Sequence, residues 1–424
     1  MYQSKKLARP VFVQRGLISS FLILVLSIST SLIPASAAIQ IDNYQNKVSS
    51  LSACELKETK NVNEYGSRKG FPIKGALPTT GELNILIVPI DFSNAPGVGN
   101  PGAMFADDVK IIAEWSTYFS RGKLAYKTTL ASKSWIRAPR GAEWYTISGQ
   151  KGGKTQLQTP AEGLQELISV TDKAFEFKKT DFVWFVFPYS AEKKFGTFIY
   201  TGVTERFKVT TEEGEQSISA YGEQGGSVIS VDRATIWDIL IHELLHFQGF
   251  IGHGPENGSG LGIMQNQWGN SKAVSTWEAF MAGWFGIDEV LCIEKSNLNQ
   301  PLAITLGSID SFDKNPVSLI IKLNDEEAII VEKRSNGKYT NFNKSFKYVG
   351  FPSRSSFANK NTFTAYYINV NKPYFRNDSD PNSYNKNYWY YLREKNNIAL
   401  SKSVSEKGVK IDILNSNQIR ISLA

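Results

Sequence analysis

All three histidines of this 424-residue chain lie within twelve residues, in the segment HELLHFQGFIGH that runs from His242 to His253. His242 and His246 are four residues apart, so on a helix both imidazoles project from one face, one turn apart. Two nitrogens in that arrangement suit a tetrahedral zinc ion. Glu243 is displaced around the helix, where its carboxylate can act as a general base on a water molecule activated by the metal. The segment predicts a site for one catalytic Zn²⁺.

The residues around these histidines have the pattern of a helix that packs on a core by one side. Asp232 or Thr235 can cap the helix, and Gly249 can take the left-handed conformation that ends it. The apolar positions form a stripe at helical spacing: Ile236, Ile239, Leu240, Leu244 and Phe247. The fold must therefore supply a buried face for this helix.

A third metal ligand has to come from outside this helix. The sequence favours His253, because Gly252 and Gly254 flank it and allow the chain to turn back toward the helix. The alternative is Glu278, at the start of a later helix, although Ser275 and Glu278 also have the spacing of a capping box. Asp288 and Glu256 are further acidic alternatives.

The N-terminal residues have the pattern of a signal peptide. A lead with four basic residues is followed by an apolar run of about 17 residues and by Ala35-Ser36-Ala37, which predicts cleavage before Ala38. An uncleaved membrane anchor is the alternative, since the run is close to the lower limit for a bilayer span. We expect residues 1–37 to be removed and the protein to be secreted. It then either diffuses away or stays attached to the cell surface. No membrane span is expected after cleavage.

The net charge does not favour nucleic-acid binding. The leader contains four of the 47 Lys and Arg residues and none of the 40 Asp and Glu residues, which leaves the mature chain near +3. A charge this small on nearly 390 residues gives no support for binding to a phosphate backbone. The expected partner is a protein or peptide substrate.

The chain has two cysteines, Cys54 and Cys292. Outside the cell an even pair most simply predicts one disulfide. The alternative is that Cys54 belongs to a propeptide and caps the metal as a thiolate.

Patterns along the chain predict an α+β fold in two domains after a lead-in. Residues 38–80 are polar and end in glycines and prolines, as in an extended lead-in or a propeptide. Residues 81–298 alternate buried strands (83–90, 182–187, 228–231) with helices (107–119, 161–177). Residues 299–424 contain short β-rich runs, typical of a small all-β domain: 317–323, 328–333, 363–370, 409–413 and 419–423.

Several stretches, taken in order, resemble the secreted zinc metalloproteases of the immune inhibitor A group, which are metzincin-like. They are LNILIVPIDFS (83–93), WSTYFSRGK (115–123), residues 135–145 and 181–188, HELLHFQG (242–249), STWEAFMAGW (275–284) and AIIVEKR (328–334). The group usually continues from the zinc helix to an aspartate where this chain has Gly252. The resemblance implies a zincin-like catalytic domain with a mixed sheet and an active-site helix. It also makes Met264 a candidate for the methionine turn beneath the zinc, the other interpretation being a core methionine.

The expected function is zinc-dependent endopeptidase activity, in which zinc activates a water molecule and Glu243 serves as the general base. The alternative is a secreted binding protein that keeps the protease scaffold but has weak or no catalysis. The departure at Gly252 motivates that alternative. The aromatic run Tyr388–Tyr391 could stack on glycans, although a buried strand or turn is the simpler explanation. A zinc hydrolase acting on a substrate other than a peptide is a third interpretation.

Overall fold

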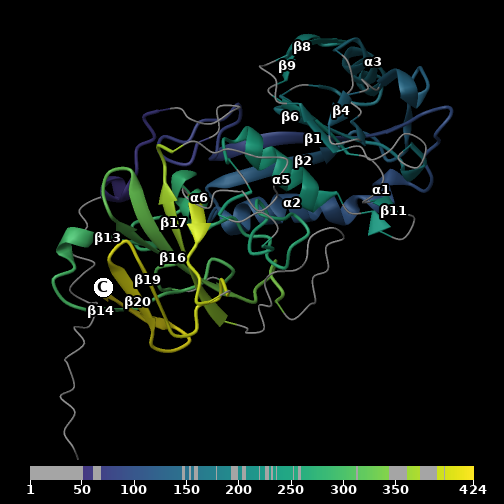
Figure 1. Cartoon of the computed structure of the whole chain (residues 1–424). Coiled ribbons are helices and arrows are strands. Elements are labelled where there is room, and N and C mark those ends of the chain that lie inside the picture. The colour runs from purple at the N-terminus through teal and green to yellow at the C-terminus, as the bar shows by residue number, and fades with distance from the viewer. Residues whose placement is uncertain are drawn as a thin grey trace, which may run out of the picture. The chain divides into compact units, whose positions relative to one another are not determined.

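The structure is a computed structural model of the chain (Figure 1). It describes residues 51–424 except 61–67, 146–148, 152–153, 157–160, 178, 192–198, 203–206, 219, 225–228, 231–232, 235, 252, 256–258, 312–313, 343–360, 373–388 and 396. The chain divides into two units, Met1–Ala37 and Ala38–Ala424. The predicted signal peptide, residues 1–37, lies outside the described residues.

The first sheet is mixed, and the helix with the histidines packs on it. Its strands run in the order β2–β1–β6–β10–β7, and β3 pairs with the end of β1. β2, β1, β6 and β10 are parallel to one another, whereas β7 is antiparallel at the edge. The bounds are β1 (Gly81–Asp91), β2 (Leu124–Leu130), β3 (Ile136–Arg137), β6 (Phe182–Val186), β7 (Ile199–Gly202) and β10 (Ala220–Gln224).

The central strands β1 and β6 are buried on both faces, as their continuous apolar sequences predict. Side chains alternate between the faces of a sheet, so Ile87 and Trp184 point into one core while Val88 and Phe185 point into another. The first core also contains residues of α2 (Ala106–Phe119) and α5 (Trp237–Phe247), and the second contains residues of α3 (Ala161–Asp172). The sheet is thus a layer between helices, which confirms the α+β class.

Short elements complete this part of the chain. They are the helix α1 (Pro101–Met104), the 3-10 helix η5 (Ala142–Tyr145) and three two-stranded hairpins: β4 (Gly149–Lys151) with β5 (Lys154–Gln156), β8 (Phe207–Thr211) with β9 (Gly214–Ile218), and β11 (Ile229–Ser230) with β12 (Arg233–Ala234).

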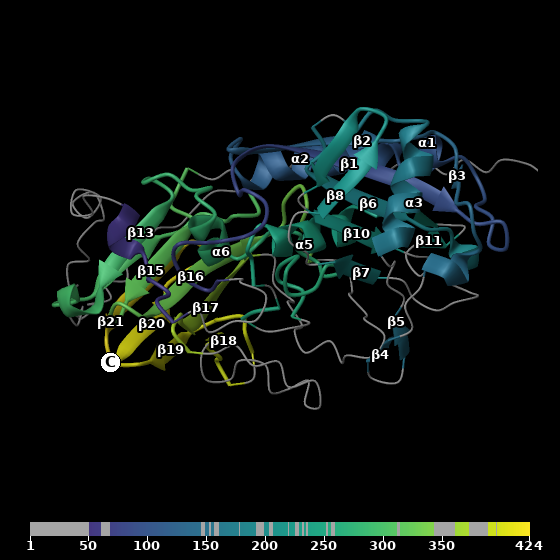
Figure 2. The same cartoon turned by 90° about the horizontal axis from the view of Figure 1, so that it is seen from above.

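The later part of the chain forms two sheets that face each other, as Figure 2 shows. One has the order β13–β15–β16–β17–β18 and the other β14–β21–β20–β19. Apolar side chains from both sheets fill the space between them, among them Ile321, Ile329 and Ile411. The bounds are β13 (Val290–Glu294), β14 (Leu302–Thr305), β15 (Ser318–Lys322), β16 (Glu327–Ser335), β17 (Asn361–Asn369), β18 (Trp389–Tyr391), β19 (Ser403–Glu406), β20 (Val409–Ile413) and β21 (Gln418–Leu423).

The first of these two sheets also contributes to the core beneath the histidine helix. Its other face carries Ile320, Ile330 and Tyr366, which belong to the same buried cluster as Leu240 and Leu244 of α5. The short helix α6 (Thr276–Met281) lies in this cluster, and all six of its residues are buried. β13 belongs to this sheet although it precedes residue 299. The helical and β-rich parts of the chain therefore share one apolar core.

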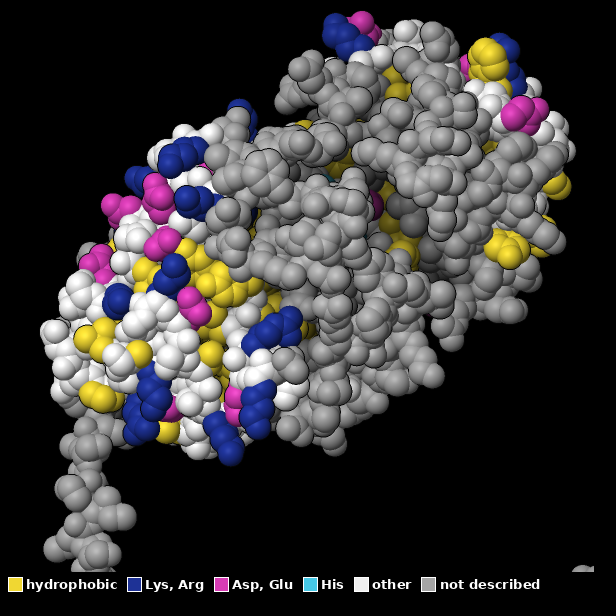
Figure 3. All heavy atoms as spheres, viewed as in Figure 1, with side chains coloured by type: hydrophobic (Ala, Val, Ile, Leu, Met, Phe, Trp, Pro, Cys, Tyr) yellow, Lys and Arg dark blue, Asp and Glu magenta, His cyan; other side chains and the backbone are white. Residues whose placement is uncertain are grey.

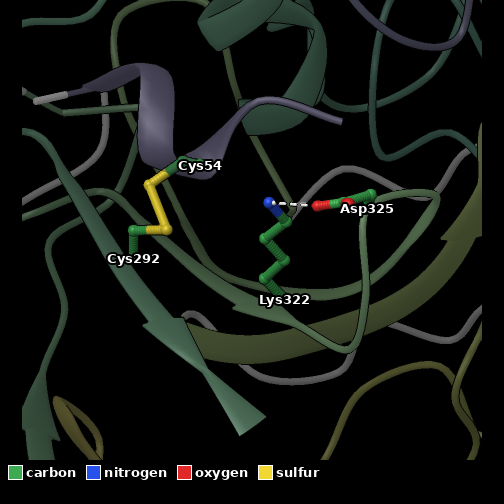
Figure 4. Close-up of a disulfide and its surroundings, with 4 residues drawn as sticks. All are labelled: Cys54, Cys292, Lys322 and Asp325. Carbon is green, nitrogen blue, oxygen red and sulfur yellow. Dashed lines mark ion pairs between the residues drawn. A yellow bond between two sulfur atoms is a disulfide. The ribbon is translucent and has the colours of Figure 1, made fainter. Parts of the chain in front are cut away.

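Cys54 and Cys292 form a disulfide, the pairing that the sequence analysis expects (Figure 4). Cys54 ends the 3-10 helix η3 (Leu51–Cys54), and Cys292 lies in β13. Lys322 of β15, drawn nearby, pairs with Asp325 at 2.9 Å. Because its sulfur is bonded to Cys292, Cys54 is not a thiolate that could cap a metal. The bond instead fastens the lead-in to the β-rich part of the chain.

Candidate metal centre

The helix that carries two of the histidines, α5, is capped by a residue from another helix. Its N-cap residue Ile236 provides no side-chain cap. Instead Oδ1 of Asp108, in α2, accepts hydrogen bonds from the backbone N–H groups of Ile236 at 2.8 Å and Trp237 at 2.9 Å. Asp232 lies outside the described residues, as does Thr235. Asp108 thus supplies the acceptor that the first turn of a helix needs, and sequence reasoning missed it because the two helices are far apart in the chain.

The Asp108 cap predicts a specific pH dependence of stability. Burial raises the pKa of Asp108 to about 7, although the two N–H donors act against this. An unfolded aspartate titrates near 3.9, so between about pH 4 and 7 the folded chain binds the additional proton, and raising the pH through this window weakens folding. In Asp108→Asn this titration is absent. The free energy of unfolding of wild type relative to Asp108→Asn should fall from pH 4 to 7 and level off above it.

The measurement is urea unfolding of both proteins at several pH values, in the presence of a chelator so that metal binding does not contribute. A difference between the two proteins that stays constant from pH 4 to 8 would contradict the raised pKa.

The structure brings His242, His246 and His253 together. One ring nitrogen from each can be chosen so that all three lie within 4.8 Å of one another, and this cluster could hold a metal ion. The ring centroids are 4.9 Å apart for His242 and His246, and 5.3 and 5.5 Å from each of these to His253. Zinc–nitrogen bonds of about 2.0–2.1 Å in a tetrahedral site require nitrogens about 3.4 Å apart, so small side-chain rotations would close the site.

Hydrogen bonds orient the two helical histidines for metal binding. Nδ1 of His242 lies 2.8 Å from the carbonyl oxygen of Ile263, and Nδ1 of His246 lies 3.1 Å from that of Phe250. Each Nδ1–H donates to its carbonyl, which leaves the Nε2 lone pair for a ligand. Burial, together with the neighbouring imidazoles, lowers the pKa of both rings to about 3. Both are therefore neutral near pH 7, the state that binds metals.

The third histidine reaches the cluster through an unusual backbone conformation. His253 has a φ of 59°, in the left-handed region that non-glycine residues rarely occupy. Its N–H donates to the carbonyl oxygen of Met264 at 2.8 Å. Gly252, the position at which the sequence departs from the usual pattern, lies outside the described residues. A strained conformation of this kind persists only when the surrounding contacts hold it.

The turn that carries Met264 supports two of the three histidines. The N–H groups of Gln265 and Asn266 donate to the carbonyl oxygen of Gly262 at 3.1 and 3.0 Å. Within the same turn, the Ile263 carbonyl accepts from His242 and the Met264 carbonyl accepts from His253. Met264 itself is buried in the core shared with α5. The turn predicted to lie near the metal therefore contacts the cluster through its backbone.

The alternative third ligands lie elsewhere or outside the described residues. Oε2 of Glu278 accepts hydrogen bonds from the N–H and the hydroxyl of Ser275, at 3.1 and 2.8 Å, and completes the capping box of α6. Burial raises the pKa of Glu278 to about 7. Asp288 is exposed, and Glu256 lies outside the described residues. In the described part of the chain, the group that could hold a metal ion contains His253 and not Glu278.

Glu243 lies between the two helical histidines and is half-buried, whereas Leu244 and Leu245 after it are buried. Burial lowers the pKa of His246, and the negative charge of Glu243 acts against this effect. The arrangement combines three imidazole nitrogens that could hold a metal, two of them in neutral rings, with one carboxylate outside that group.

Residues 68–78, which we call the strap, hold the C-terminal end of α5. The N–H of Leu77 donates to the Phe247 carbonyl at 3.0 Å, and the N–H of Arg68 donates to the Gly249 carbonyl at 3.2 Å. The Gln248 side-chain amide donates to the Pro78 carbonyl at 2.6 Å. These bonds satisfy groups that a helix end otherwise leaves without partners. The strap thus fixes the end of the helix that is nearer to His246.

The aromatic run proposed for glycan stacking is largely internal. Trp389 and Tyr391 are buried, and Tyr390 is half-buried with its hydroxyl bonded to Glu406 at 3.1 Å. Tyr388 lies outside the described residues. Because buried rings cannot stack on an external sugar, Trp389 and Tyr391 do not support the binding-protein alternative.

No protein-family model and no curated protein matches this chain. Over the described residues, none of the helices combines the length and the apolar character needed to cross a bilayer. In the described part of the face shown in Figure 3, basic and acidic side chains are interspersed.

Proposed function

We propose that this protein is a secreted zinc-dependent endopeptidase of the immune inhibitor A type. The observation that carries the proposal is the convergence of His242, His246 and His253, with Glu243 on the same helix as the first two. The mixed sheet on which α5 packs supports a zincin-like catalytic domain over residues 81–298. The Cys54–Cys292 disulfide supports secretion, because such bonds persist in oxidising compartments.

The residues of the cluster fit zinc better than a harder cation. The donors are three imidazole nitrogens, and two of them belong to rings that are neutral and oriented by backbone carbonyls. Calcium and magnesium prefer oxygen ligands, whereas three protein nitrogens with one open position are typical of catalytic zinc. Zinc bound there would polarise the scissile carbonyl and activate water as a nucleophile.

Glu243 supplies the proton transfers. Its carboxylate oxygen takes one proton from the attacking water as the new carbon–oxygen bond forms. It then donates that proton to the nitrogen of the leaving amine as the carbon–nitrogen bond breaks. The sum is one peptide bond and one water converted into a carboxylic acid and an amine. The half-buried position of Glu243 allows a substrate to reach it.

Removal of the metal should abolish the activity reversibly. The purified 38–424 chain is expected to hydrolyse an unfolded protein such as reduced casein, to lose this activity in a chelator, and to recover it when zinc is added back. His246→Ala, treated in the same way, should not recover, because the site lacks one ligand. Hydrolysis that persists in the chelator, or its absence from a folded and zinc-loaded sample, would overturn the proposal.

A further inference from the structure

The short strand β18 packs on the loop that contains the third histidine. A Cβ atom added to Gly254 would lie 2.2 Å from Cε3 and 2.4 Å from Cζ3 of Trp389. The indole therefore occupies the space beside the Gly254 backbone, directly after His253. Trp389 is fully buried in the core that also contains α5. The ring is thus packed against the residue that follows the proposed ligand His253.

The same strand contacts the turn of Met264. The side-chain amide of Gln265 donates to the hydroxyl oxygen of Tyr391 at 2.8 Å, and both residues are buried. The side-chain oxygen of Gln265 accepts a hydrogen bond from the Ser259 hydroxyl. Gln265 follows Met264, whose carbonyl accepts from the N–H of His253. Trp389 and Tyr391 thus reach the two segments that meet at that hydrogen bond.

We propose that Trp389 and Tyr391 are positioning residues of the metal centre, through which the C-terminal β region sets metal affinity and geometry. This inference rests on the metal site of the proposed function but not on peptidase activity. The left-handed conformation of His253 needs support from its surroundings. Trp389 packs beside Gly254, next to the donor of the His253–Met264 hydrogen bond, and Tyr391 bonds to Gln265, next to its acceptor. Groups that orient metal ligands typically change metal affinity 10–100-fold when they are removed.

Tyr390 provides a matched control in the same strand. Successive side chains of a strand point to opposite faces, and Tyr390 packs against the core between the two β sheets, 5.1 Å from the Tyr367 ring. Its hydroxyl bonds to Glu406. Tyr390→Phe and Tyr391→Phe therefore remove the same atom, on opposite faces of β18.

The test is the binding of Zn²⁺ to wild type, Tyr391→Phe, Trp389→Phe and Tyr390→Phe by competition with a chelating dye, and the visible absorption of the Co²⁺ forms. We expect about a tenfold weaker Zn²⁺ affinity and an altered Co²⁺ spectrum for Tyr391→Phe and Trp389→Phe. Tyr390→Phe should match wild type. Thermal unfolding without metal separates these effects from a loss of stability.

Metal affinity and spectra that match wild type in both Tyr391→Phe and Trp389→Phe would overturn the inference, even if their metal-free forms were less stable. If Trp389→Phe fails to fold, the result for Tyr391→Phe alone decides whether the inference stands, since this variant keeps the aromatic ring of residue 391. A wild-type chain that binds no zinc would instead contradict the proposed function itself, so the two failures are distinguishable.

Discussion

Glu243→Gln is expected to lower kcat for peptide hydrolysis by about 10²–10⁴-fold while the zinc content stays unchanged. The amide has nearly the size of the carboxylate but cannot accept a proton from water. None of the three ligands is altered, because the metal-binding group consists of His242, His246 and His253. The measurement is kcat and KM on a quenched fluorescent peptide, with zinc quantified in the same samples.

Asp288→Asn is the control for the loss of one acidic charge, since Asp288 is exposed and outside the ligand group. It should retain activity within twofold. Glu243→Gln activity above about a tenth of wild type would exclude Glu243 as the general base. A binding protein on the same scaffold would keep its ligand affinity in Glu243→Gln, so this variant also separates the two functional classes.

Gly249→Ala is expected to destabilise the protein by about 2–5 kcal/mol. Gly249 has a φ of +95°, where an L-residue costs about 1–2 kcal/mol. In addition, an added Cβ would lie 2.3 Å from the Lys74 carbonyl oxygen of the strap, a backbone atom that cannot easily move. Overpacking of this kind costs about 1–3 kcal/mol more. The measurement is the free energy of unfolding from denaturant titration.

Gly122→Ala is the control that measures the cost of the positive φ alone, without a steric clash. Gly122 has a φ of +78°, and nothing lies within 4 Å of its added Cβ. We expect a loss of only about 1–2 kcal/mol for this variant. Equal losses at both positions would mean that the strap does not press on the end of α5.

The contacts of the strap also help to decide whether the lead-in, residues 38–80, is a propeptide that is removed, which was one interpretation of the sequence. Release of residues 38–80, which takes both a cut after residue 80 and reduction of the Cys54–Cys292 disulfide, would remove the N–H donors of Arg68 and Leu77 from the end of α5 and take the buried Leu77 out of the core. It would also remove the buried Lys69, whose ammonium group donates to the Asn369 carbonyl at 3.1 Å. These contacts favour a lead-in that stays with the folded protein.

Elements with a regular local pattern could be predicted from the sequence. The continuous apolar runs at 83–90 and 182–187 correspond to β1 and β6, and the helical spacing at 107–119 corresponds to α2. The spacing of His242 and His246 likewise determines that they share one face of α5. These predictions hold because the burial of each segment is encoded in its own residues.

Features that depend on distant partners could not be predicted in this way. Asp108 caps a helix 128 residues further along the chain, and nothing near either residue indicates the pairing. For the aromatic residues of β18 the sequence favours a buried strand or turn over a stacking surface, and the burial of Trp389 and Tyr391 confirms this, but the segments that cover them are distant in the chain. His253 joins the cluster through a left-handed conformation that residue type alone does not predict. In each case tertiary contacts decide the outcome.

The disulfide between Cys54 and Cys292 closes a covalent ring that includes α2, α5 and all three histidines. A single cut at any peptide bond between these cysteines opens the ring but leaves both pieces in one molecule. If the proposed peptidase function holds, this matters at high concentration, because each copy then meets other copies as substrates. A copy nicked by its neighbour would retain its metal ligands on one connected chain until a reductant separates the fragments.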